Sequence, residues 1–156
     1  MRSDFPLKEK YGFHDLVQIM RVLRGPGGCP WDAQQTHASI RKNFIEETYE
    51  AIEAIDAADP VLLQEELGDV LLQVIYHAAM EEEQGSFSID DVCDGVCKKL
   101  VTRHPHIFGD IKADTAEEVL SNWEEIKQRE KGQKTATETL ESVPKVFPAL
   151  MRAHKI

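Results

Sequence analysis

The sequence predicts an all-α protein, folded as an antiparallel helical bundle. Apolar residues recur at helical spacing along most of the 156 residues. No segment shows the strict apolar–polar alternation that is typical of a half-buried strand. Proline and turn residues separate the periodic segments by short stretches, and short connections between helices favour antiparallel neighbours.

The first three predicted helices occupy the N-terminal half of the chain. The first begins at Phe13 and ends before Gly25, and a Gly/Pro-rich loop follows through Pro30. Two longer helices are predicted at about 38–57 and 60–84. They are divided by an Asp-Pro step, because a proline can open a helix but cannot continue one.

Capping signals place two further helices. Ser88 is predicted to cap a fourth helix that runs to about Arg103. Thr115 and Glu118 form the pattern of a capping box for a fifth helix that ends at Gly132.

The whole chain, 1–156, is predicted to be one domain, which is ordinary for this length. Its core is expected at about 13–131, followed by a polar linker at 133–142. Residues 143–156 read as the start of a C-terminal helix without a stop signal, which suggests that the chain is a piece of a longer protein.

Two acidic pairs are the most informative pattern in the chain. Glu47 and Glu50 on one predicted helix, and Glu66 and Asp69 on the next, are each spaced i, i+3. Each pair therefore lies on one side of its helix, and antiparallel packing would bring four carboxylates to a common seam, where they could share a hard divalent cation. The alternative is that both pairs are solvated faces of acidic helices, as expected for the run 81–83, and spacing alone leaves both interpretations open.

Composition excludes some functions. The net charge of −10 disfavours nucleic acid and anionic membranes as partners, because both require basic patches. The sequence has no signal peptide and no apolar run long enough to span a membrane, so a cytoplasmic location is expected. Three cysteines without a C-x-x-C pair indicate no disulfide framework.

The motifs resemble a known family. The acidic segment 46–50 followed by Glu66-Leu67-Gly68-Asp69 is similar to the signature of the MazG-type nucleoside triphosphate pyrophosphohydrolases. The segments 23–32 and 103–108 resemble the same family in order and spacing, and the match covers about residues 13 to 153. The resemblance implies a MazG-type helical bundle with four core helices per site and extra helices, and it points to a homodimer. It also implies hydrolysis of nucleoside triphosphates between the α and β phosphates to a monophosphate and pyrophosphate.

The resemblance also implies site residues. A Mg²⁺ ion, or Mn²⁺ in its place, would be held by four carboxylates, and a fifth would hold a second metal or act as general base: Glu47, Glu50, Glu66 and Asp69, with Glu46 as the fifth. Lys99 and Arg103 would contact the phosphates, although they could equally be a basic helix C-terminus. Trp31 would stack on the base, or else anchor the core.

Two departures keep other functions open. The family often has basic residues where this chain has Asn43 and Leu62, which favours a catalytically weak or inactive module that serves oligomerisation or regulation. Family members often carry two such domains in tandem, and this chain resembles the first. A di-iron bundle is the weakest alternative, because neither acid pair has a histidine at i+3. Spacing predicts neither the base and sugar preference nor whether one or two metals bind.

Overall fold

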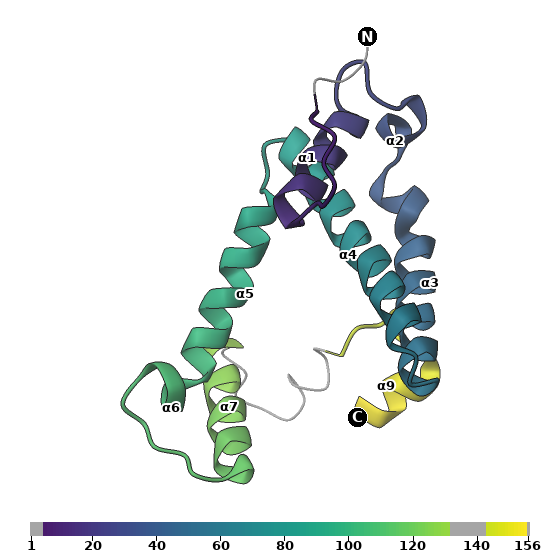
Figure 1. The fold of residues 1–156 in the computed structure, drawn as a ribbon. Coiled ribbons are helices and arrows are strands. Elements are labelled where there is room, and N and C mark those ends of the chain that lie inside the picture. Colours follow the sequence, from purple (N-terminus) through teal and green to yellow (C-terminus); the bar gives the residue numbers. More distant parts are fainter. Residues whose placement is uncertain (1–4, 132–142, 156) are drawn as a thin grey trace. The chain divides into compact units, whose positions relative to one another are not determined.

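All regular structure in the described part of the chain is helical, which confirms the predicted class (Figure 1). The computed structural model describes residues 5–131 and 143–155, so the predicted linker at 133–142 lies outside it. The helices are α1 (Phe13–Arg24), α2 (Pro30–Gln34), α3 (His37–Asp56), α4 (Pro60–Glu83), α5 (Ile89–Arg103), α6 (Pro105–Phe108), α7 (Ala116–Lys131) and α9 (Ala149–Lys155). The chain divides into two compact units, Met1–Cys93 and Asp94–Ile156, and each is described by itself.

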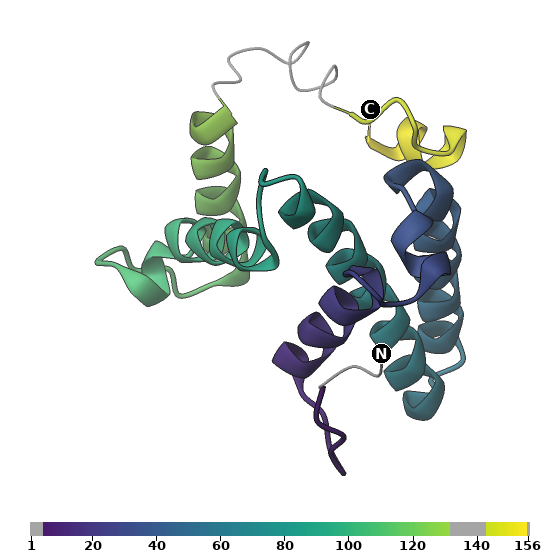
Figure 2. The ribbon, with the colours of Figure 1, turned by 90° about the horizontal axis from the view of Figure 1, so that it is seen from above.

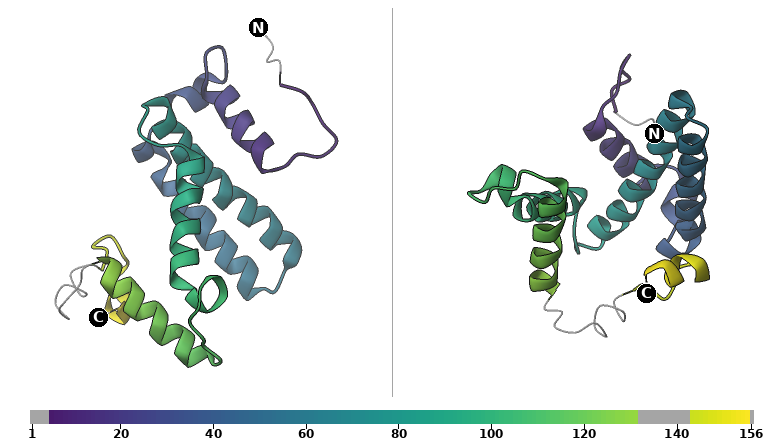
Figure 3. Two further views of the ribbon diagram at one scale, coloured as in Figure 1. Left: turned by 90° about the vertical axis from the view of Figure 1, so that its left-hand side faces the viewer. Right: turned by 90° about the horizontal axis from the view of Figure 1, so that it is seen from below.

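An antiparallel hairpin of α3 and α4 dominates the first unit, and α1 packs against α4 (Figures 2 and 3). Both hairpin helices begin at a side-chain cap: Thr36 accepts a hydrogen bond from the Ser39 amide, and Asp59 accepts from the Val61 and Leu62 amides. These caps put the two helices within two residues of their predicted bounds. The buried core residues of this unit are Val17, Met20, Ile40, Ile75, Tyr76, Ala78, Ala79, Met80 and Ile89.

The short helix α2 was not expected from the sequence, which predicted a loop through Pro30. Pro30 stands at its first turn, and the hydroxyl of Tyr76 on α4 donates to Asp32 at 2.9 Å. Burial, followed by the hydrogen bond with Asp32, raises the pKa of Tyr76 to about 12, so the phenol keeps the proton that it donates. A tertiary contact therefore stabilises a helix that is too short to be recognised by periodicity.

The acidic run at the end of α4 is partly solvated, as the sequence predicted, but its acids also form ion pairs. Arg21 and Arg24 on α1 pair with Glu82 and Glu83 at 2.7 and 2.6 Å. The Arg24 side chain is only 5% exposed, and it also donates to two backbone carbonyls of the segment that carries α2. These ion pairs fix α1 and α2 against the C-terminal half of α4.

Part of the predicted apolar stripes remains uncovered. Ile40 and Ala51 of α3 are buried, but Ile52 and Ile55 of the same stripe are 45% and 59% exposed. On α4, Leu67 is 53% exposed. The hairpin therefore presents a wider apolar surface than the described chain covers.

The second unit contains most of α5 and the helices that follow it. The predicted capping box is present: the Glu118 carboxylate accepts from the Thr115 amide, and the Thr115 hydroxyl accepts from the Glu118 amide. Arg103 lies 5.3 Å over the Trp123 ring and pairs with Glu130. No helix in the described residues is long and apolar enough to cross a membrane.

Candidate metal centre

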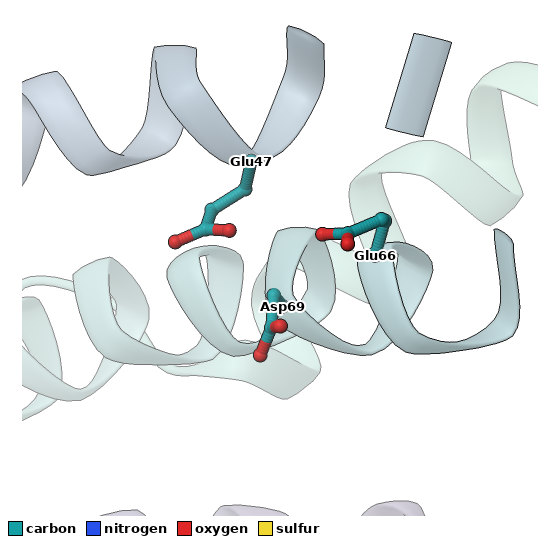
Figure 4. A group of neighbouring side chains, drawn as sticks. All are labelled: Glu47, Glu66 and Asp69. Atoms are coloured by element: carbon teal, nitrogen blue, oxygen red, sulfur yellow. The ribbon is translucent and has the colours of Figure 1, made fainter. Parts of the chain in front are cut away.

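Three of the predicted carboxylates converge between the two hairpin helices. Glu47 projects from α3 toward Glu66 and Asp69 of α4 (Figure 4). One carboxylate oxygen from each residue lies within 4.8 Å of one from each of the others, and all three side chains are partly buried. The i, i+3 spacing puts the two α4 acids on the same side of that helix, and the antiparallel partner supplies the third.

Glu50 is exposed and does not belong to the three-residue group, but it lies beside it. The pKa of Glu47 is raised by burial, then by the charges of Asp69 and Glu50, and also by a hydrogen bond with Glu50. The pKa of Glu66 is raised by burial, then by the charges of Glu50, Glu65 and Asp69. Glu50 therefore acts electrostatically on a carboxylate of each helix.

Among the described residues, these four acids form no ion pair with a lysine or arginine. Their mutual repulsion can be relieved by a proton or by a cation. Carboxylate oxygens are hard ligands that suit Mg²⁺ or Mn²⁺, so the donor set of this group fits such an ion. The group can hold one divalent cation between α3 and α4.

The fifth acid has a different environment. Glu46 forms an i, i+4 ion pair with Lys42 at 2.6 Å on an exposed part of α3, and it is outside the converging group. Its role as a general base or as ligand of a second metal stays a prediction.

The predicted substrate-binding residues belong to other helices than α3 and α4. Trp31 lies on α2 and is 61% exposed. Lys99 is an exposed residue of α5 in the second unit. Arg103, in the same unit, donates two hydrogen bonds to one oxygen of Glu130, at 2.9 and 2.7 Å. These residues stay predictions as substrate contacts.

Sequence reasoning missed a polar cluster at the other end of the hairpin. The Nδ1 atoms of His37 on α3 and His77 on α4 are 2.6 Å apart, and His37 Nε2 lies 2.7 Å from Glu81 Oε1. The two rings are parallel within 4°. Because the rings are parallel, the distance between their planes cannot exceed the 2.6 Å that separates the two nitrogens, which is too short for stacking. The rings therefore meet edge to edge, and the two nitrogens share one proton. The sequence contained a signal for this cluster. Asp69, His77 and Glu81 are separated from one another by multiples of four residues, which places them along one face of α4.

Comparisons with known proteins find the same family by sequence and by structure. Residues 35–108 match the model of the MazG nucleotide pyrophosphohydrolase domain, a range that contains the hairpin and all four acids. The crystal structure of a mazG-related protein from Thermotoga maritima is similar to the chain with a TM-score of 0.62 and 27% sequence identity, over 74% of this chain and 99% of that one.

Curated relatives are also similar over most of the chain. The uncharacterized protein YabN of Bacillus subtilis is 50% identical over 97% of the chain and 32% of its own length. The nucleoside triphosphate pyrophosphohydrolase of Escherichia coli K12 is 47% identical over 90% of the chain and 54% of its own length. The nucleoside triphosphate pyrophosphohydrolase/pyrophosphatase MazG of Thermotoga maritima is 48% identical over 92% of the chain and 54% of its length. The chain thus spans about a third to about half the length of these relatives, and its residues 35–108 match the MazG nucleotide pyrophosphohydrolase domain.

Proposed function

We propose that this chain is a divalent-cation-dependent nucleoside triphosphate pyrophosphohydrolase that cleaves between the α and β phosphates. One observation carries the proposal: Glu47, Glu66 and Asp69 converge inside the range that matches the MazG domain, and no lysine or arginine of the described residues forms an ion pair with them. Relatives named nucleoside triphosphate pyrophosphohydrolase support the activity.

Glu47, Glu66 and Asp69, with Glu50 beside them, would hold Mg²⁺, or Mn²⁺ in its place. The bound cation would neutralise phosphate charge and stabilise the pyrophosphate leaving group. A bound cation would also offset the repulsion between a triphosphate and a chain of net charge −10.

The residues that would contact substrate are proposed from the resemblance alone. Lys99 and Arg103 would bind phosphate, and Trp31 would stack on the base. Glu46 would orient the attacking water, which requires release from its exposed pair with Lys42. Exposed ion pairs contribute only about 0–1 kcal/mol, so this release costs little.

The direct test is pyrophosphate release from a panel of ribo- and deoxyribonucleoside triphosphates, measured with Mg²⁺ and with chelator. We expect release with Mg²⁺ that stops when the metal is removed. No release from any triphosphate would favour the second candidate, a MazG-fold module that serves oligomerisation or regulation. Asn43 and Leu62 favour that candidate, because they stand where the family often has basic residues.

We also propose that the chain forms a homodimer through the uncovered apolar surface of the hairpin. The exposed apolar residues on α3 and α4 support this proposal: Ile45, Tyr49, Ile52, Ile55, Val61, Leu67 and Leu71. Light scattering at micromolar concentration should give about twice the chain mass of 17.7 kDa. A single species at the monomer mass would contradict the proposal.

A further inference from the structure

A hollow of about 480 Å³ opens beside the His37–His77 pair. Its walls are mainly apolar and aromatic, with three polar side chains: the lining residues are His37, Phe44, Val74, His77, Ala78, Glu81, Phe87 and Val92. Pockets of about 300–1,000 Å³ with apolar walls and a few placed polar groups are typical sites for small molecules. All lining residues belong to the first unit, so the hollow is defined without the second.

A row of polar side chains on α4 connects this hollow with the acidic group. Asp69, Gln73 and His77 follow one another at i, i+4 spacing and therefore share one face of the helix. Asp69 and His77 both meet side chains of α3, so Gln73 between them faces α3 as well. The rise from Asp69 to His77 is about 12 Å at 1.5 Å per residue. A nucleoside triphosphate is long enough to cover that distance from its metal-bound phosphates to its base.

Gln73 gives a second indication of a ligand. Its side chain is only 6% exposed, yet its Oε1 atom has no hydrogen-bond partner among the described residues. Buried polar atoms are nearly always paired, and an unpaired acceptor calls for an external donor. Gln73 therefore has an unfilled acceptor on the helix face between the acidic group and the hollow, and it does not line the hollow itself.

The histidine pair orients another acceptor at the hollow. Glu81 uses Oε1 to pair with His37, and no hydrogen bond in the described residues occupies its Oε2. The edge-to-edge contact between His37 and His77 fixes the ring that holds this carboxylate. Glu81 is partly buried, so it can present Oε2 to a ligand in the hollow.

We infer that this hollow binds the base of the nucleoside triphosphate and that Glu81 selects bases that carry an amino group. The inference rests on the proposed function, since it assumes that the acidic group holds the phosphates. A carboxylate accepts a hydrogen bond from an exocyclic amine but repels a carbonyl oxygen at the same position. Phe44 and Phe87 would contribute aromatic surface to the base.

Cytidine and uridine monophosphates are the matched probes, because their bases differ at the position that carries an amine or a carbonyl oxygen. Binding is measured by calorimetry with Mg²⁺ present. A monophosphate has no α–β phosphoanhydride bond to cleave, so the readout is independent of turnover. We expect cytidine monophosphate to bind on the order of tenfold more tightly than uridine monophosphate. Equal affinities in the wild-type chain would overturn the inference.

Two variants assign the preference to this hollow. Glu81→Gln keeps the shape of the side chain but adds an amide donor, so the preference for cytidine monophosphate should disappear or invert. His77→Phe should reduce the preference for cytidine monophosphate, because it removes the contact that holds His37 against Glu81. Circular dichroism checks that this variant is folded. The control is His14→Phe, an exposed position on α1, which should keep the wild-type preference. A Glu81→Gln variant with an unchanged preference would overturn the inference.

The two proposals fail separately. Absence of pyrophosphate release from every triphosphate would overturn the proposed function, while the monophosphate binding would still decide the inference. Release with equal affinity for the two monophosphates would overturn the inference and leave the proposed function intact.

Discussion

The two halves of α4 carry the same kind of side chain in opposite surroundings. Near its C-terminus, Glu82 and Glu83 each pair with an arginine of α1. Near its N-terminus, Glu66 and Asp69 face another carboxylate from α3, and no basic side chain in the described residues pairs with them. An acidic residue on a helix therefore indicates a ligand site only when its neighbours have the same sign and the chain supplies no counter-charge.

The largest expected effect is at the unpaired end. Asp69→Asn keeps the shape of the side chain but removes one negative charge from the shared group. Turnover with Mg²⁺ should fall about 100-fold or more, because a weaker metal site loses several kcal/mol of transition-state stabilisation. The measurement is steady-state pyrophosphate release at saturating Mg²⁺.

Its control is Glu53→Gln, an exposed acid on α3 outside the converging group. This variant removes the same charge from the chain but leaves the converging group intact, so it should keep wild-type turnover. Equal losses in both variants would mean that net charge, and not the group, determines the rate.

A smaller effect is expected at the paired end, and it concerns stability. Arg24→Ala removes the partner of Glu83 and leaves two backbone carbonyls that it bonded, at a side chain only 5% exposed. Unfolding free energy should fall by about 2 kcal/mol, measured by urea denaturation. The exposed Lys42→Ala change should cost less than about 0.5 kcal/mol. Comparable losses in the two variants would contradict the distinction between buried and exposed pairs.

The smallest effect is a pH dependence at the histidine pair. Burial, then the charge of His37, lowers the pKa of His77 from its usual value of 6.5. The unfolded chain then binds a proton more readily than the folded chain, so stability is lost as the pH falls from 6.5 toward the lowered folded pKa. Denaturation in chelator at several pH values should show this loss.

The His77→Phe variant has no proton to bind at this position, so it should lack that part of the pH dependence. An identical pH profile in wild type and variant would exclude His77 as its source. Carboxylates with raised pKa values, such as Glu47, act in the opposite direction, because they bind protons more readily in the folded chain.

Sequence patterns predicted those parts of the fold that depend on local signals. Proline, capping residues and periodicity located α3 and α4 within two residues, and i, i+3 spacing identified Glu66 and Asp69 as one side of a helix. The sequence could not predict α2, because its five residues are held by a contact from Tyr76. It also did not predict the ion pairs of Glu82 and Glu83, because their arginine partners stand about 60 residues earlier in the chain. Long-range pairing depends on helix register, which residue spacing does not encode.

The same limit applies to the site. Whether Glu50 joins the group depends on small differences in rotation between α3 and α4, and the structure leaves it beside the group and exposed. The His37–His77 contact required the antiparallel register of the hairpin, although the spacing along α4 was visible in the sequence.

The most direct test of the shared metal site is Mg²⁺ titration of wild type, Glu50→Gln and Asp69→Asn, with melting temperatures measured with and without Mg²⁺. The account predicts that Mg²⁺ raises the melting temperature of the wild type and that both variants bind the ion more weakly. Without metal, both variants should melt at or above the wild-type temperature, because each substitution removes a repulsive charge from the group. If both variants keep wild-type Mg²⁺ affinity, the helices share no ion and the non-catalytic module becomes the better account.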